Sequence, residues 1–126
     1  MFNWLAVGIG GALGSMARYG IAVLIGTQFS SKWPWATFIA NLLGCLIIGA
    51  LYVVLIEKNM LPEQYRAFLI VGFLGGLTTF STFSLEVVRL IELQEFQLAA
   101  MYSIGSLLIC LVCVWGTILL IRTLYS

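Results

Sequence analysis

Long apolar runs, separated by short polar links, dominate the chain. Each run is long enough to cross a bilayer as a helix, which needs about 20 residues. The runs cover residues 3–26, 34–56, 63–92 and 96–122. The third is interrupted at 75–79 by two glycines and two threonines. The pattern predicts an all-α integral membrane protein, a single domain over residues 1–126 with four transmembrane helices, the third broken within the membrane.

Composition supports this class and excludes others. Hydrophobic residues make up 62% of the chain, charged residues 9%, and the mean hydropathy is +1.09, whereas a soluble domain carries about 25% charged residues. The net charge is +1 without a basic cluster, which argues against nucleic acid as a partner. The chain has no histidine, so we expect neither His-based catalysis nor His metal ligands. No nucleophile–base pair is visible, and we do not expect an enzyme.

The three cysteines and the N-terminus do not point to a functional site. Cys45, Cys110 and Cys113 lie in apolar runs, where free cysteines usually behave as small hydrophobic residues, and we expect no disulfide or metal role for them. The N-terminus has no positively charged region and no clear cleavage site, so we expect the first run to be retained as a span rather than removed as a signal peptide.

The stretch 75–84 carries the most unusual chemistry. It reads Gly-Gly-Leu-Thr-Thr-Phe-Ser-Thr-Phe-Ser. A helix break here frees backbone groups, which are tolerated at membrane depth only where protein or a water-filled cavity covers them. The carbonyls of Gly75 and Thr78 could coordinate a small hard cation. Beyond them, backbone amides, hydroxyls and the positive edges of aromatic rings favour an anion. The anion-path candidates here are Phe80, Ser81, Thr82, Phe83 and Ser84.

Isolated polar residues on the other spans leave alternatives open. Asn41 is the one strongly polar side chain of the second span, and it either lines a path or makes an interhelical hydrogen bond. Arg18 is the only charge of the first span, and it either concentrates anions at a vestibule or snorkels to the interface. Glu86 shares a helix face with Arg89 near the end of the third span.

Helix packing is predicted from two further patterns. Small residues recur at Ala6, Gly10 and Gly14, a spacing that allows close helix contact in lipid. On the fourth span a polar stripe follows helical spacing, and it serves either as helix–helix contact, which we favour unless the third span faces it, or as pore lining. The stripe consists of Tyr102, Ser106, Cys110, Cys113 and Thr117.

Charge balance across the predicted membrane indicates dual topology. The six Lys and Arg residues divide evenly between the two sides, with Lys58, Arg66 and Arg122 on one and Arg18, Lys32 and Arg89 on the other. Orientation normally follows a bias of these residues, so a chain without one can insert both ways. Because closed two-fold dimers are the commonest oligomers, we predict an antiparallel homodimer.

Three motifs resemble those of the Fluc (CrcB) family of fluoride channels. They are residues 75–84 as written above, Asn41-Leu-Leu-Gly, and Gly10-Gly-Ala-Leu-Gly-Ser-Met-Ala-Arg18-Tyr. The resemblance covers the whole chain. It implies a multi-pass protein of the bacterial inner membrane, an antiparallel dimer with two pores that passively exports fluoride and relieves its toxicity. It also implies a structural Na⁺ at the dimer centre, held by the main-chain carbonyls of Gly75 and Thr78.

The resemblance also assigns side-chain roles. Matches to pore-lining positions are Asn41, Phe80, Phe83, the hydroxyl track Ser81, Thr82 and Ser84, and on the fourth span Tyr102 and Ser106. Arg18 and Glu86 match vestibule positions, while Cys110 stands where a hydroxyl is expected. The residues alone reach only a dimeric anion pathway with a central cation site; the identity of the ion comes from the resemblance.

Two alternatives belong to other classes. A small dual-topology, proton-coupled multidrug-type transporter needs a membrane-embedded carboxylate, for which Glu86 is the sole candidate. A structural subunit without transport would not explain the density of hydroxyl and Phe residues in the third span.

Overall fold

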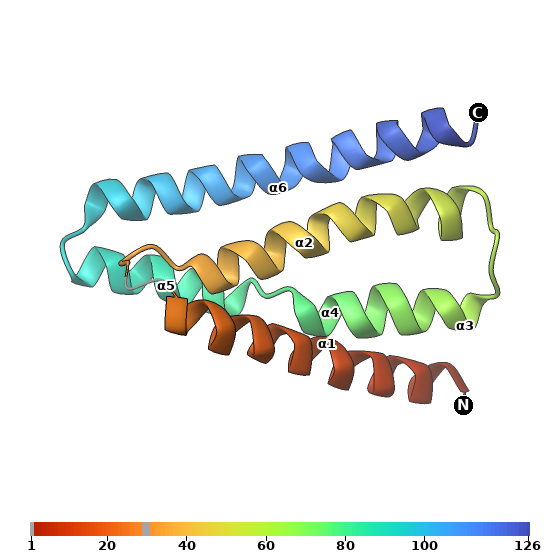
Figure 1. Cartoon of the computed structure of the whole chain (residues 1–126), viewed down its shortest axis with the longest axis horizontal. Coiled ribbons are helices and arrows are strands. Elements are labelled where there is room, and N and C mark those ends of the chain that lie inside the picture. Colours follow the sequence, from red (N-terminus) through yellow and green to blue (C-terminus); the bar gives the residue numbers. More distant parts are fainter. Residues whose placement is uncertain (1, 29–30) are drawn as a thin grey trace.

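Four long helices make up the fold. The structure, a computed structural model, describes residues 2–28 and 31–126. Within them, the helices long and apolar enough to cross a membrane are Phe2–Thr27, Trp35–Glu57, Glu63–Glu92 and Phe96–Leu124. This confirms the all-helical prediction and its four spans, with boundaries shifted by a few residues. Figure 1 shows consecutive spans running in opposite directions, with both chain ends at one end of the bundle.

The spans are divided into shorter elements. The first is α1 (Phe2–Gln28), the second is α2 (Trp35–Leu51) continued by the π-helical η1 (Tyr52–Glu57), and the fourth is α6 (Phe96–Leu124). The third comprises α3 (Glu63–Arg66), the π-helical η2 (Ala67–Leu74), α4 (Gly75–Leu77) and α5 (Ser81–Glu92). Helix α1 packs on η2 and α4, and α6 packs on α2 and α5. Helix α2 also contacts η2, α4 and α5, so the third span contacts each of the other three spans.

Glycines bring α1 directly against the third span. A Cβ atom added at Gly10 would collide with the carbonyl of Phe68, and one at Gly14 would collide with the carbonyl of Phe73. On the other side, Gly76 lies against the backbone of α1 in the same way. The predicted close packing of the small residues is confirmed at Gly10 and Gly14, because only a glycine fits where two backbones meet.

Helical geometry in the third span stops later than the sequence predicts. Gly75 and Gly76 are still helical, in α4. Thr78 is extended, with φ −87° and ψ 157°, and α5 starts at Ser81. The non-helical residues are thus 78–80, seen as the link between α4 and α5 in Figure 1. The expected range of 75–79 was wrong at its start, because Gly76 serves close packing on α1 instead of ending the helix.

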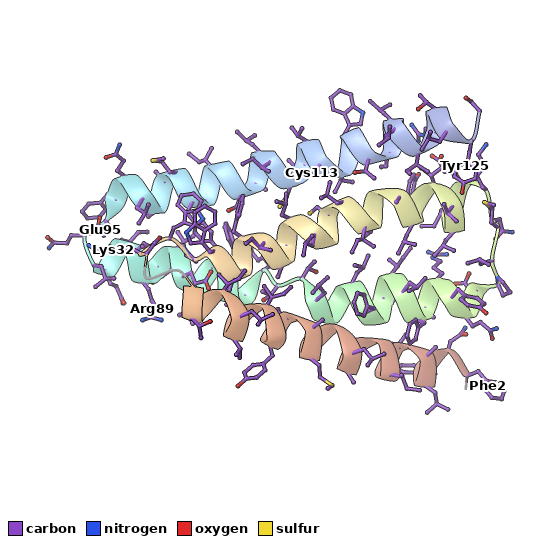
Figure 2. The ribbon with its side chains drawn as sticks, viewed as in Figure 1. Phe2, Lys32, Arg89, Glu95, Cys113 and Tyr125 are labelled. Atoms are coloured by element: carbon purple, nitrogen blue, oxygen red, sulfur yellow. The ribbon has the colours of Figure 1, made fainter. Side chains whose placement is uncertain are left out.

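Ion pairs join the links at the two ends of the bundle. Lys32 pairs with Glu95 at one end, where Figure 2 shows both residues, and Arg122 pairs with Glu57 at the other. These pairs are largely exposed, so each contributes little to stability. Their role is to tie the ends of α6 to those of the second span.

Candidate functional site

The side chain of Asn41 on α2 holds the non-helical link. Its Nδ2 donates to the Thr79 carbonyl at 3.0 Å, and its Oδ1 accepts from the Thr79 N–H at 2.8 Å. Of the two roles open to Asn41, the interhelical hydrogen bond is therefore present. An amide carries two N–H groups, so one remains available for another acceptor.

Arg18 on α1 bonds the backbone of α4, just before the link. Its Nε donates to the carbonyl of Gly76 at 3.0 Å, and the side chain is half-buried. A cation beside the last carbonyls of a helix satisfies a group that the helix leaves unpaired. Arg18 thus binds the end of α4 within the protein, a role that neither sequence-based alternative included.

Thr79 begins the second half of the span. Its Oγ1 accepts from the N–H of Thr82 at 3.2 Å, and it also contacts the hydroxyls of Thr82 at 3.2 Å and Ser81 at 3.3 Å. Thr79 directly precedes Phe80, the N-cap residue, whose own side chain makes no capping bond. The Thr79 hydroxyl therefore satisfies one of the N–H groups that the first turn of a helix leaves unpaired. Sequence reasoning did not select Thr79 as a site residue.

These bonds take donors away from two carbonyls. In a continuous α-helix the N–H of Thr79 would bond the Gly75 carbonyl, and the N–H of Thr82 would bond the Thr78 carbonyl. Asn41 takes the first N–H, and the Thr79 hydroxyl takes the second. The carbonyls of Gly75 and Thr78, which were predicted as cation ligands, both lose these helical donors.

A groove of about 400 Å³ runs along one side of the link. Its wall combines residues of the second, third and fourth spans. The predicted site residues on this wall are Asn41, Gly75, Thr78, Phe80, Phe83 and Ser106. The structure therefore brings together six positions that are up to 65 residues apart in sequence, from Asn41 to Ser106.

A second, more polar cavity of about 320 Å³ lies nearby. Predicted vestibule residues Arg18 and Glu86 line it together with Thr82. Thr37 and Thr79, which sequence reasoning missed, also line it. Thr79 belongs to both walls, so the link just before α5 borders both spaces.

Both oxygens of Glu86 are held by hydroxyl groups from neighbouring spans. Thr37 donates to Oε1 at 2.7 Å and Tyr102 donates to Oε2 at 2.7 Å. Thr37 and Tyr102 are 6% and 0% exposed, respectively. Over residues 2–28 and 31–126 no ion pair joins Glu86 to Arg89. Figure 2 shows Arg89 at the end of the bundle where Lys32 and Glu95 lie. The helical spacing of Thr37, Asn41 and Cys45 is the signal that could have identified Thr37.

Aromatic rings form a continuous series beside the groove. The ring centroids of Phe80 and Phe83 are 5.6 Å apart at an interplanar angle of 40°, and those of Phe83 and Tyr102 are 5.2 Å apart at 50°. The predicted shared face of Phe80 and Phe83 is confirmed by this contact. Phe80 is 77% exposed, so the series runs from the surface of the chain to its interior.

The remaining hydroxyls divide between different roles. Ser84 Oγ donates to the Phe80 carbonyl at 2.9 Å, whereas Ser81 is exposed and contacts Thr79. Among the described residues that line the two cavities, neither of these serines is present. Ser106 differs from both, because its Oγ is buried and has no hydrogen-bond partner within the described part of the chain. At this position the polar stripe of α6 lines the groove.

Comparison with known proteins gives consistent results. A family model described as "CrcB-like protein, Camphor Resistance (CrcB)" matches residues 5–118. A Geobacter metallireducens protein named "Fluoride-specific ion channel FluC" is 40% identical over 124 residues, covering 98% of this chain and 100% of that protein. A protein of the same name from Nitrobacter winogradskyi is 42% identical over 105 residues, 83% of each chain. Another, from Chloroflexus aurantiacus, is 47% identical over 81 residues, and the match spans only 64% of each chain.

Proposed function

The chain belongs to the CrcB-like family, and on this premise we propose that it is a passive, fluoride-selective ion channel. The observation that carries the proposal is the link at residues 78–80, which borders two cavities. Asn41 bonds Thr79 within the link, Arg18 bonds the backbone just before it, and the Thr79 hydroxyl bonds the helix that follows. A transmembrane helix interrupted in this way needs covering protein or a water-filled path. In this chain a polar cavity and a ring-lined groove both border the link, at Thr79.

The chemistry of these walls favours a small anion. The groove offers the remaining N–H of Asn41, the unpaired hydroxyl of Ser106 and the rings of Phe80 and Phe83. Ring edges are electropositive, and hydroxyl and amide donors can replace water around an anion. Among the described groove residues none carries a fixed charge, which suits conduction because an ion must leave each site as readily as it enters.

We propose that two chains pair antiparallel and enclose two pores. Phe80 is 77% exposed in the single chain. Gly75 is also exposed, with nothing within 4 Å of an added Cβ. A second copy placed against this face would cover both residues and close the groove. The balanced charges of the links leave neither orientation favoured, which supports dual topology.

A structural Na⁺ at the dimer centre fits the same face. The carbonyls of Gly75 and Thr78 lack their helical donors, and Gly75 is not covered by the chain itself. Hard cations bind oxygen ligands, and two copies of these carbonyls would provide about four oxygens. The bound cation would supply positive charge where two α4 ends meet, and the chain would position its carbonyls around it.

The proposed direction is export across the bacterial inner membrane. Neutral hydrogen fluoride crosses lipid and ionises in the more neutral cytoplasm, where the anion is trapped. A membrane potential that is negative inside drives an anion outward by about 2.3 kcal/mol per 100 mV. A selective passive pore is therefore sufficient to relieve fluoride toxicity.

The alternative of proton-coupled multidrug transport is less well supported. Such a mechanism needs a carboxylate that exchanges protons for a cationic substrate. Thr37 and Tyr102 each donate to one of the two Glu86 oxygens, so the only candidate carboxylate already serves as an acceptor that joins three helices.

Ion efflux from liposomes that contain the purified protein would test the proposal. We expect fast fluoride release, measured with a fluoride electrode, that requires only a potassium ionophore for charge balance. A parallel chloride-loaded sample should release little anion. Absence of fluoride release from folded protein would overturn the channel function, and a proton-coupled cation assay with Glu86→Gln would then be the next experiment.

A further inference from the structure

Two cysteines from different spans meet in the groove. Cys45 of α2 and Cys110 of α6 both line it, on two helices that pack directly against each other, and their thiols are close enough to interact electrostatically. Both residues are free and partly buried.

We propose that Cys45 and Cys110 form a two-thiolate site for a soft, two-coordinate d¹⁰ cation of the Hg²⁺, Ag⁺ or Cu⁺ class. Thiolates select such cations because both partners are polarisable. Binding is a proton exchange without redox change: two S–H bonds break, two S–metal bonds form, and two protons leave to water. With Hg²⁺ the product is uncharged, so it avoids the cost of a net charge at membrane depth.

The ligand count distinguishes this class from zinc. Structural Zn²⁺ takes four ligands, usually Cys and His. In residues 2–28 and 31–126 no group of three or more Cys, His, Asp or Glu side chains is placed to hold a metal. The Cys45–Cys110 pair therefore fits a linear two-coordinate cation better than a tetrahedral one.

Ser106 provides a second, independent observation. Its hydroxyl is buried with the residue 7% exposed, lacks a partner among the described residues, and lies on the same groove wall. Ser106 is one helical turn before Cys110, on the same face of α6. From there its hydroxyl can donate to a Cys110 thiolate or add a weak oxygen contact to the cation.

A cation at this site would lie in the groove that Asn41, Phe80 and Phe83 also line. It would therefore obstruct an anion on its way along the groove. This consequence rests on the proposed channel function, whereas binding of the cation itself does not.

Mercuric ion binding by the purified full-length protein tests the site without any transport. Binding is followed by the thiolate-to-mercury absorption band in the presence of excess monothiol competitor. We expect one tightly bound Hg²⁺ per chain in the wild type and in Cys113→Ser. This matched control removes a cysteine of α6, labelled in Figure 2, that is absent from the groove wall among the described residues.

Cys45→Ser and Cys110→Ser should each bind Hg²⁺ at least about 100-fold more weakly, because the second sulfur acts at high effective concentration. Two independent variants keep the test valid if one of them misfolds. Wild-type affinity in either folded variant, or loss of binding in Cys113→Ser, would overturn the site.

Fluoride efflux then separates the two proposals. Micromolar Hg²⁺ should block efflux in wild type and Cys113→Ser, with recovery on addition of a dithiol. In Cys45→Ser and Cys110→Ser, Hg²⁺ should leave the efflux rate at the value that the same variant shows without Hg²⁺. Tight binding without block would overturn the obstruction of the groove. Tight binding in a protein that never releases fluoride would instead contradict the channel function and support the cation site.

Discussion

The side-chain amide of Asn41 bonds both backbone groups of Thr79, at 3.0 Å to the carbonyl and 2.8 Å to the N–H. One side chain from the second span thus replaces the two helical bonds that Thr79 gives up. Without it, two backbone polar groups within the membrane would lose their partners, which costs about 1–3 kcal/mol for each group. Asn41 is therefore a structural support of the link as well as a candidate anion ligand.

We predict that Asn41→Asp suppresses fluoride efflux at neutral pH. A carboxylate keeps an acceptor for the Thr79 N–H but loses the donor to its carbonyl, and it adds negative charge to an anion path. Efflux measured with a fluoride electrode should fall by at least about tenfold, equivalent to about 1.4 kcal/mol. Partial recovery on acidification, which neutralises the carboxyl, would distinguish charge from misfolding. Unchanged efflux in the folded variant would place Asn41 outside the path.

Phe80→Ile and Phe83→Ile should each reduce fluoride flux while dimers still form. An aliphatic side chain fills similar space but lacks the electropositive ring edge. Phe80 is 77% exposed in the single chain, so its replacement should cost the chain little stability. Phe96→Ile, which alters another exposed phenylalanine at the start of α6, is the matched control and should conduct normally. Normal flux in both pore variants would remove the ring-edge hypothesis.

The sequence predicts the spans better than it predicts the link. Apolar length determines the four spans, because a bilayer requires that length whatever the neighbours are. The link depends on tertiary contacts: Gly76 stays helical to pack on α1, and Asn41 and Arg18 bond the backbone around residues 78–80 from other helices. Local propensity favours a break at paired glycines, so it placed the start of the break too early.

Dependence on tertiary contacts also explains which site residues the sequence does not reveal. Thr37 can donate a hydrogen bond to Glu86 only when α2 and α5 are packed together. Glu86 and Arg89 share a helix face by spacing, but the carboxylate bonds Thr37 and Tyr102 instead. Helical periodicity identifies faces, whereas the choice of partner requires knowing which helices meet.

Prolonged removal of Na⁺ should slow fluoride efflux or loosen the dimer. The proposed ligands are main-chain carbonyls of Gly75 and Thr78, so no side-chain substitution removes them directly. Thr78→Val deletes only the hydroxyl bond to the Leu74 carbonyl, 2.8 Å long, and should retain the sodium dependence. Dimer content is measured by size-exclusion chromatography after dialysis into a large organic cation. Full insensitivity to sodium would leave the two carbonyls without their proposed ligand.

Labelling in intact cells should find both orientations of the chain. The link between η1 and α3 contains Met60, which is 52% exposed and whose side chain makes no hydrogen bond among the described residues. Met60→Cys should react with an impermeant thiol reagent in about half of the chains, and in all of them after permeabilisation. The unsubstituted chain is the control, since its cysteines lie within the spans. Labelling from one side only would contradict the antiparallel dimer.

The hydroxyl groups of Thr37 and Tyr102, which donate to Glu86, should be energetically coupled to its carboxylate. Thr37→Val leaves Oε1 without its donor, and Tyr102→Phe leaves Oε2 without one. Each loss at this partly buried carboxylate should lower stability by about 1–3 kcal/mol, measured by thermal unfolding in detergent. In a Glu86→Gln background the same substitutions should cost less, because a neutral amide binds a hydroxyl donor more weakly than a carboxylate does. The difference between the backgrounds is the coupling energy of a double-mutant cycle. Equal costs in both backgrounds would mean that Thr37 and Tyr102 stabilise the bundle by packing alone, and that the Glu86 charge is held by something other than these two bonds.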